Sequence, residues 1–246
     1  PALSPDINAA AARVLDRVGI SLVQGDTAGC CGALRYHLNF QADGLNDMRR
    51  VIDAWWPAVE RKEVESIVMT ASGCGVMVKE YGHLLAGDPA YRDKAARISA
   101  MTRDIAEVLA AEPAALATQF ARMGDRPGAS RGAPRRVAFH PPCTLQHGQQ
   151  LGGVAERILA AAGFDLAPVP DAHLCCGSAG TYSILQPELA EKLKAGKLAA
   201  LQSGRPEAIL TANIGCQSHL AGGTRMAVKH WIVALDERLS DGAQAA

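Results

Sequence analysis

The sequence predicts an α/β protein built from two tandem, duplicated βαβ-type domains, each with a parallel sheet. Two observations predict this class: three blocks of residues occur twice in the same order, and short apolar strands alternate with amphipathic helices in the second copy. A third observation predicts where a site lies, because each cysteine of the second copy comes shortly after a predicted strand. Open α/β sheets place their sites at the carboxyl ends of their strands.

Three pairs of segments carry the internal repeat. The repeated blocks are residues 13–20 and 157–164, residues 30–32 and 175–177, and residues 67–74 and 209–216. Small differences in the spacing of these blocks are typical of a duplicated domain whose loops have changed length. The blocks predict a first repeat at 1–121 and a second at 136–246, joined at 122–135 by a linker rich in Gly, Pro and Arg.

The second repeat shows the expected order of elements. Its predicted elements are strands 136–140, 166–169 and 208–212 and helices 153–162, 187–201 and 226–239. Pro187 favours a helix start and Gly163 a helix stop. The first repeat has no counterpart of the first strand or of Cys143. We therefore expect that this chain is part of a longer protein whose missing cysteine lies immediately before Pro1.

The charge balance gives no sign of a polyanionic partner. The formal net charge is +0 and the isoelectric point about 7.4, so the chain as a whole has no basic surplus for nucleic acid or an anionic membrane. No apolar run approaches the roughly 18 residues of a spanning helix, and no export signal opens the sequence. We expect a cytoplasmic protein, either free or at the inner face of the cell membrane.

Seven cysteines are the unusual feature of the composition. They are Cys30, Cys31 and Cys74 in the first repeat and Cys143, Cys175, Cys176 and Cys216 in the second. Adjacent Cα atoms about 3.8 Å apart are closer than a relaxed disulfide prefers, so two Cys-Cys pairs argue against disulfides. In a reducing compartment such a set indicates metal or redox chemistry. We predict that the second repeat's four cysteines bind a metal centre and that the first repeat's three are cofactor ligands too.

Four thiolates fit either an iron–sulfur cluster or a structural zinc ion. The cysteines are widely spaced and form no Cys-x-x-Cys knuckle, which favours a polynuclear cluster, most simply [4Fe–4S], with zinc as the alternative. A thiol–disulfide enzyme is a third interpretation, but the dithiol motif that supports it is absent from the sequence. No Gly-x-Gly-x-x-Gly motif follows a strand, so we expect neither flavin nor catalytic residues on this chain.

Two histidines and a tryptophan pair are further candidates. His219 follows Cys216 by three positions and is a candidate metal ligand. His140 comes just before the first ligand loop and is placed to donate a hydrogen bond to a cluster sulfur. Trp55 and Trp56 follow apolar helical positions, which favours packing, with contact to a partner as the alternative.

The segments around the cysteines resemble a known family. Residues 28–33 and 174–182 resemble the CCG cysteine-rich domains of heterodisulfide reductase B subunits. Residues 8–20, 53–57 and 70–85 more closely resemble the iron–sulfur subunits of bacterial glycolate oxidases (glycolate dehydrogenases), and this resemblance covers essentially the whole chain. The chain departs from the heterodisulfide reductase pattern in one respect. Met77 and His219 stand where that pattern ends each repeat with a cysteine.

The resemblance implies an electron-transfer subunit of an oxidoreductase. Flavin-containing glycolate oxidase subunits would oxidise glycolate to glyoxylate and would alone carry flavin. An additional N-terminal ferredoxin-like domain with two [4Fe–4S] clusters would precede this chain, and the complex would associate peripherally with the membrane or not at all. Lactate-utilisation proteins, which have two CCG domains and little else, are the alternative within the resemblance. A zinc-binding scaffold subunit is the alternative outside it.

Overall fold

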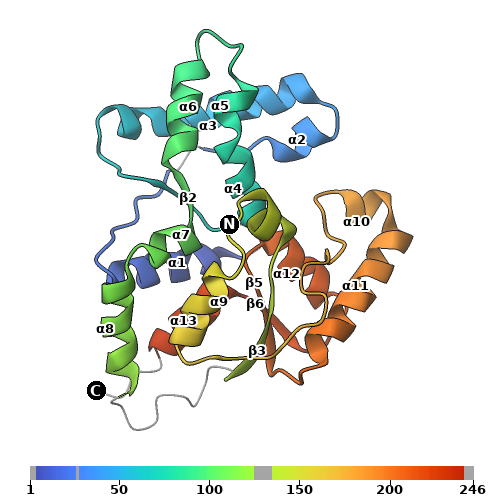
Figure 1. The fold of residues 1–246 in the computed structure, drawn as a ribbon. Helices are drawn as coiled ribbons and strands as arrows, with labels where there is room; N and C mark the ends of the chain where they lie inside the picture. The colour runs from blue at the N-terminus through green and yellow to red at the C-terminus, as the bar shows by residue number, and fades with distance from the viewer. Residues whose placement is uncertain (1–3, 26–27, 125–134, 241–246) are drawn as a thin grey trace. The chain divides into compact units, whose positions relative to one another are not determined.

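The structure is a computed structural model that describes residues 4–25, 28–124 and 135–240. Its contacts divide the chain into two compact units, which we call the large unit (residues 1–22 and 106–246) and the small unit (residues 23–105). Figure 1 labels the elements of both. The predicted linker lies mostly outside the described residues, at 125–134. The predicted repeat boundaries describe a duplication in the sequence, and they do not coincide with these two compact units. The boundaries therefore stay a prediction.

The large unit is built on a four-stranded parallel sheet with the order β4-β3-β5-β6. The strands are β3 (Arg136–His140), β4 (Asp165–Leu166), β5 (Ala208–Thr211) and β6 (Ala227–His230). The central strands β3 and β5 are almost entirely buried, which explains why both are short continuous apolar runs. His140, Thr211 and His230 lie side by side in register at the carboxyl edge.

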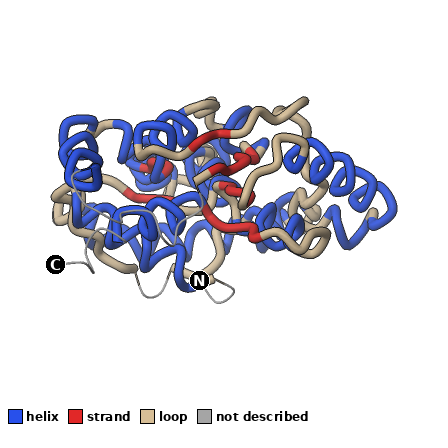
Figure 2. Tube along the Cα trace, turned by 90° about the horizontal axis from the view of Figure 1, so that it is seen from below, coloured by secondary structure: helices blue, strands red, loops and turns tan. Residues whose placement is uncertain are grey.

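Helices cover both faces of this sheet (Figure 1). Helices α9 (Val154–Ala161) and α13 (Trp231–Ser240) contact each other on one face, and α11 (Pro187–Gln202) and α12 (Ile214–Ala221) contact each other on the other. Right-handed crossovers require this arrangement, because the chain moves from β3 to β4 in one direction and from β4 to β5 in the opposite one. Figure 2 shows the strands, in red, flanked by helices. The predicted parallel α/β class is confirmed.

The remaining elements of the large unit are short, apart from two helices. They are α1 (Pro5–Arg17), α7 (Ile105–Ala110), α8 (Pro113–Gly124), the π-helical turn η1 (Thr144–Gly148) and α10 (Tyr182–Leu185). Helix α1 packs against α13 through its apolar face. Arg13 on α1 donates two hydrogen bonds, of 2.8 and 2.6 Å, to one carboxylate oxygen of Asp236 on α13.

The small unit holds a two-stranded parallel sheet and a helical layer. Its elements are α2 (Ala33–His37), α3 (Gln41–Glu60), β1 (Ile67–Met69), α4 (Ser72–Lys79), α5 (Tyr81–Leu84), α6 (Arg92–Met101) and β2 (Thr102–Asp104). Its core contains Met48, Ile52 and Ile98. Trp55 and Trp56 pack against that core, so the structure shows the expected packing role for both.

Two predicted elements of the second repeat differ from the structure. The expected strand 166–169 pairs only over Asp165–Leu166. Residues 227–230, expected to begin the last helix, form the edge strand β6 instead, and α13 begins at Trp231. The apolar spacing of this stretch fits a helix, but hydrogen bonding to β5 decides the outcome. Among the described residues, no helix is both long enough and apolar enough to cross a membrane.

Candidate metal centre

The candidate metal centre lies at the carboxyl edge of the large unit's sheet. Strands β3 and β5 are neighbours there, but the chain leaves β3 toward the α9 face and β5 toward the α12 face. Neighbouring strands that send their helices to opposite faces leave a crevice at the carboxyl edge. Three loops bring cysteines to this edge. They are Cys143 after β3, Cys175 and Cys176 after β4, and Cys216 in α12 after β5.

The four sulfurs form a hydrogen-bonded chain, and none of them is in a disulfide. Hydrogen bonding to Cys175 raises the pKa of Cys143, and hydrogen bonding to Cys175 and Cys216 raises the pKa of Cys176. The reverse holds for their partners. The hydrogen bond from Cys143 lowers the pKa of Cys175, and the hydrogen bond from Cys176 lowers the pKa of Cys216 to about 6. Two of the four sulfurs are therefore favoured as thiolates, the form that binds metal.

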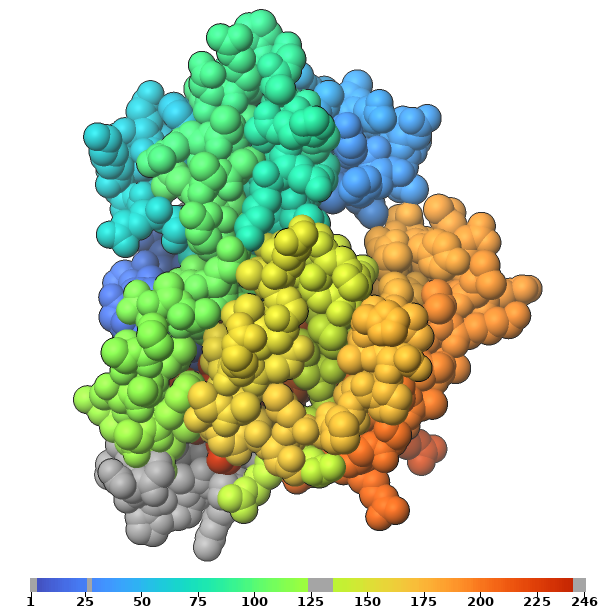
Figure 3. Space-filling view, viewed as in Figure 1, coloured from blue at the N-terminus to red at the C-terminus, as the bar shows by residue number. Residues whose placement is uncertain are grey.

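Half of this cysteine set belongs to the hydrophobic core. Cys176 and Cys216 are buried and pack with Ala138 of β3, Ile209 of β5 and Leu220 of α12. Cys143 and Cys175 are only partly buried. The site therefore has two sulfurs packed against the sheet and two that are more accessible. The chain around the vicinal cysteines and the following helix α11 lies on the face shown in Figure 3, in gold to orange.

His140 lies against the buried sulfurs. One of its ring nitrogens and the sulfurs of Cys176 and Cys216 all lie within 4.8 Å of one another, and all three residues are buried. This spacing suits a group of atoms that share one metal ion. The imidazole interacts with the sulfur of Cys216, and this interaction contributes to the lowered pKa of Cys216. Sequence reasoning placed His140 beside the site without predicting that its whole ring is enclosed there.

A buried lysine holds the loop that carries the vicinal cysteines. Lys197 of α11 is 3% exposed, and its ammonium donates to the carbonyl oxygens of Asp171 and Ala172 at 3.1 and 3.0 Å. Burial lowers the pKa of Lys197, and the nearby Cys176 and Cys175 oppose that shift. Sequence reasoning missed this residue. Its signal was a lysine at a helical position that shares a face with buried Ala190, Leu198 and Leu201.

The glycine after the vicinal cysteines is required by the backbone. Gly177 has a φ of 91°, and a Cβ there would lie 2.5 Å from the carbonyl oxygen of Ala190 on α11. This close approach aims the Gly177 amide at Cys175, whose sulfur accepts its hydrogen bond at 3.3 Å. On the other side of the site, Gln146 donates to the carbonyl oxygens of Pro141 and His173, which ties the β3 loop to the vicinal-cysteine loop.

The small unit gathers the other three cysteines. Cys31 hydrogen-bonds to both Cys74 and Cys30, and the bond with Cys74 raises the pKa of Cys31 and lowers that of Cys74. The hydroxyl of Tyr81, which is fully buried, donates to the Cys31 carbonyl oxygen at 2.8 Å. Burial, followed by the charges of the neighbouring sulfurs, raises the pKa of Tyr81. These cysteines therefore meet as predicted from the repeat, but Cys30 is exposed.

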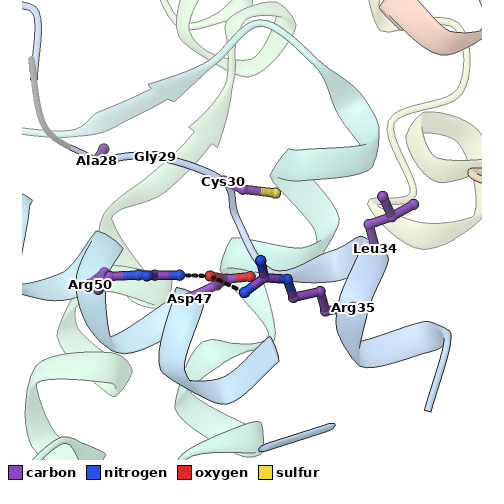
Figure 4. Close-up of a pocket in the computed structure, with 7 residues that line it drawn as sticks. All are labelled: Ala28, Gly29, Cys30, Leu34, Arg35, Asp47 and Arg50. Carbon is purple, nitrogen blue, oxygen red and sulfur yellow. Dashed lines mark hydrogen bonds and ion pairs between the residues drawn. The ribbon is translucent and has the colours of Figure 1, made fainter. Parts of the chain in front are cut away.

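A cavity of about 460 Å³ adjoins Cys30 in the small unit. Figure 4 shows Arg35 and Arg50 meeting at Asp47 on its wall. Arg35 pairs with Asp47 at 3.3 Å, and Arg50 pairs with the same carboxylate oxygen. Asp47 is buried, whereas both arginine side chains are more than half exposed. The cavity is open, its lining is more apolar than polar, and the two guanidinium groups offset its one carboxylate.

The structure places the predicted site residues in two groups, one per unit. The four cysteines of the second repeat meet in the large unit and the three of the first repeat meet in the small unit. His219 is not in the group formed by His140, Cys176 and Cys216, although its Nε2 is buried without a hydrogen-bond partner among the described residues. Metal binding by any of these residues stays a prediction.

Comparison with known proteins gives two kinds of relative. The Escherichia coli (strain K12) glycolate oxidase iron-sulfur subunit is 52% identical over 239 residues, which cover 97% of this chain and 56% of that protein. Lactate utilization protein A of Geobacillus thermodenitrificans (strain NG80-2) is 26% identical over 242 residues, which cover 95% of this chain and 93% of that protein. A probable glycolate oxidase iron-sulfur subunit of Bacillus subtilis (strain 168) is 29% identical over 210 residues.

The chain spans about half the length of the glycolate oxidase subunits that it matches. The family profile described as CCG, cysteine-rich domain, matches residues 1–79 and 137–221. These two stretches contain all seven cysteines, and together they cover most of the chain. The chain therefore belongs to the CCG cysteine-rich domain family.

Proposed function

We propose that this chain is the iron–sulfur, electron-transfer part of a glycolate-oxidising flavoenzyme complex. The observation that carries the proposal is the convergence of four free cysteines from three loops at the carboxyl edge of the large unit's sheet. The 52% identity to a glycolate oxidase iron-sulfur subunit supports the same conclusion. Glycolate oxidation itself would take place in flavin-containing partner subunits.

The donor atoms of the large unit fit an iron–sulfur cluster. Two sulfurs are buried in an apolar layer and two are partly open, and the four donors come from three separate loops rather than from one short knuckle. A structural zinc site needs only four tetrahedral donors and commonly draws them from Cys-x-x-Cys turns. We therefore favour a cluster, of the [4Fe–4S] type, held by Cys143, Cys175, Cys176 and Cys216.

The protein groups around this site have defined tasks. The apolar residues beside Cys176 and Cys216 exclude water, and the Gly177 amide donates to the sulfur of Cys175. Hydrogen bonds to thiolate sulfurs and exclusion of water both tune the potential of a bound cluster. When bound, such a cluster supplies single-electron transfer. Lys197 places a positive charge near two thiolates and so offsets negative charge at the site.

Glycolate, rather than lactate, is the substrate that we assign to the complex. Relatives of both kinds cover nearly all of this chain, but identity is 52% to the Escherichia coli protein and 26% to the lactate utilization protein. The partners would be flavin-containing glycolate oxidase subunits. The complex would lie in the cytoplasm or at the inner face of the cell membrane.

Anaerobic purification of the chain together with its flavin partners tests the proposal. A bound cluster gives brown protein with broad absorption near about 400 nm, and with iron and acid-labile sulfide in comparable amounts. The complex should reduce an artificial electron acceptor with glycolate. Colourless protein with stoichiometric zinc would establish the scaffold alternative, and oxidation of lactate alone would establish the lactate-utilisation alternative. Cys176→Ser should remove the absorption, whereas the exposed Lys192→Met on α11 serves as a matched control.

A further inference from the structure

A buried lysine lies next to the large-unit site and has only carbonyl groups as its direct partners. Lys197 of α11 is 3% exposed, and its ammonium donates to the carbonyl oxygens of Asp171 and Ala172. Within the described part of the chain, no carboxylate forms an ion pair with it. Lysine is almost never fully buried unless it is paired with an opposite charge. The burial of this cation therefore calls for a negative group close by.

The fold by itself does not require a lysine at this position. The glycine of each Cys-Cys-Gly turn approaches a carbonyl oxygen of the second helix that follows it, that of Gly44 on α3 and that of Ala190 on α11. Seven residues after these two carbonyl groups stand Val51 and Lys197. Val51 is 2% exposed and lies in the core of the small unit. An apolar side chain thus fills this position in one copy and a cation fills it in the other.

The contacts of α11 place the lysine beside the vicinal cysteines. Leu198, the next residue of the helix, packs in one buried cluster with Cys176. The Asp171 carbonyl oxygen that accepts from Lys197 also accepts from the amide of Leu174 at 3.0 Å. This second bond closes a turn directly before the vicinal cysteines. The ammonium therefore lies at the base of the loop that carries two of the four sulfurs.

The negative groups that act on Lys197 include the sulfurs of this loop. Burial lowers the pKa of Lys197, and the charges of Cys176, Cys175 and Asp171 oppose that shift, in this order of size. Each of the two cysteines thus favours the charged ammonium more than the Asp171 carboxylate does. Charges interact strongly at a buried site because little water screens them. The same attraction acts in reverse on any negative charge that enters the site.

We propose that Lys197 is a positioning residue for electron transfer, whose fixed positive charge raises the midpoint potential of the centre held by the neighbouring thiolates. The proposal rests on the proposed function, since it requires a redox-active metal centre at these cysteines. One electron from a flavin partner adds one negative charge to the site and oxidises the flavin by one electron. The ammonium takes up no proton in this step, because it is already protonated. It stabilises the added charge and so favours the reduced form of the centre.

Lys194 provides a matched control on the same helix. It is also buried, at 9% exposed, but its ammonium pairs with Glu191 at 2.7 Å, so its charge is already compensated. A Cβ at Gly223 would lie 3.1 Å from its Cε, which places Lys194 against the loop after α12. The two lysines therefore separate an effect of the charge beside the vicinal cysteines from a general effect of removing a buried lysine.

The test is a redox titration of the anaerobic complex, followed by electron paramagnetic resonance. Lys197→Met should keep its iron and shift the midpoint potential to a more negative value. At a fixed ambient potential, the ratio of reduced to oxidised centre should fall roughly tenfold or more. Lys197→Arg keeps the charge and should keep a potential close to that of the wild type. Lys194→Met and the exposed Lys192→Met should leave the potential unchanged.

The outcomes that overturn the inference are distinct from those that overturn the proposed function. A wild-type potential in iron-loaded Lys197→Met would leave the centre in place and reduce Lys197 to a support of the loop. An equal shift in Lys194→Met or in Lys197→Arg would show that the charge at this place is not the cause. Absence of iron from the wild-type complex would refute both the centre and the inference.

A second variant decides the question if Lys197→Met does not fold or loses its iron. Lys197→Gln keeps an N–H donor for the carbonyl oxygens of the loop but carries no charge. Its midpoint potential should be more negative than that of the wild type, as in Lys197→Met. A wild-type potential in Lys197→Gln would refute the proposal.

Discussion

The two cysteine sites use the same local device in different surroundings. In both units a Cys-Cys pair is followed by a glycine of positive φ, 82° at Gly32 and 91° at Gly177. A Cβ would lie 2.6 Å from the Gly44 carbonyl oxygen in the small unit and 2.5 Å from that of Ala190 in the large unit. The local turn is therefore the same in both copies. In each, the glycine contacts the backbone of the second helix that follows it, α3 in the small unit and α11 in the large unit.

The surroundings differ in the strand that precedes the site. In the large unit, β3 delivers His140 and Cys143 to the carboxyl edge, and two of the four sulfurs are buried. Among the described residues of the small unit, only β1 and β2 form strands, and Cys30 is exposed. The comparison teaches that the vicinal cysteines form the same turn in both units, whereas the fuller sheet of the large unit buries two of its four sulfurs.

The largest expected effect is loss of iron from the large unit. Cys176→Ser should remove most of the cluster absorption and electron transfer, whereas Cys31→Ser should remove much less. Changing a group that merely hydrogen-bonds a metal ligand typically costs roughly 10–100-fold in affinity, and the loss of a ligand costs more. Iron analysis of both variants measures this. Bleaching by Cys31→Ser together with unchanged iron in Cys176→Ser would reverse the assignment of the two sites.

The shared turn predicts an equal effect in both units. Gly177→Ala and Gly32→Ala should each destabilise their unit by about 2–4 kcal/mol, because an L side chain at positive φ is strained and its Cβ meets a backbone carbonyl. Chemical denaturation measures the change. Gly196→Ala on α11 is the matched control, since this exposed helical glycine has no atom within 4 Å of its Cβ position. The Gly196→Ala variant should raise the free energy of unfolding by about 0.5–1 kcal/mol.

The side chains that hydrogen-bond the backbone of the two Cys-Cys loops predict a smaller effect. Tyr81→Phe removes the hydrogen bond to the Cys31 carbonyl oxygen, and Lys197→Met removes those to the carbonyl oxygens of Asp171 and Ala172. Each should lower the free energy of unfolding by about 1–3 kcal/mol, because buried carbonyl groups lose their partner. Hydrogen exchange of the loop amides would locate the change. Equal exchange in wild type and variant would show that these side chains do not hold the loops.

The smallest expected effect concerns the helix pair α1 and α13 of the large unit. Asp236→Asn should cost about 1 kcal/mol or less, because Arg13 is 55% exposed and solvent screens the ion pair. The loss should shrink as salt concentration rises. Urea unfolding at two ionic strengths, with the double variant Arg13→Gln and Asp236→Asn, gives the coupling energy. A cost well above that range, independent of salt, would show that the pair acts through packing instead.

The sequence alone determined the class of the fold and which cysteines meet at each site. Strands β3 and β5 are buried almost throughout, so they had to be short apolar runs that pattern reasoning finds. The cysteines follow strands, and parallel strands end at one edge, so their meeting could also be predicted. The glycine of each Cys-Cys-Gly turn was likewise visible, since a sharp turn against a helix needs a residue without a side chain.

Only the tertiary structure decided the features that depend on contacts distant in sequence. Residues 227–230 have the apolar spacing of a helix, yet they form an edge strand because β5 supplies hydrogen-bond partners. Helix α1 belongs to the first repeat by sequence, but it packs in the large unit against α13 through Arg13 and Asp236. His140 is enclosed beside two sulfurs only because three chain segments converge there. Local periodicity contains no information about such partners, which exist only once the chain has folded.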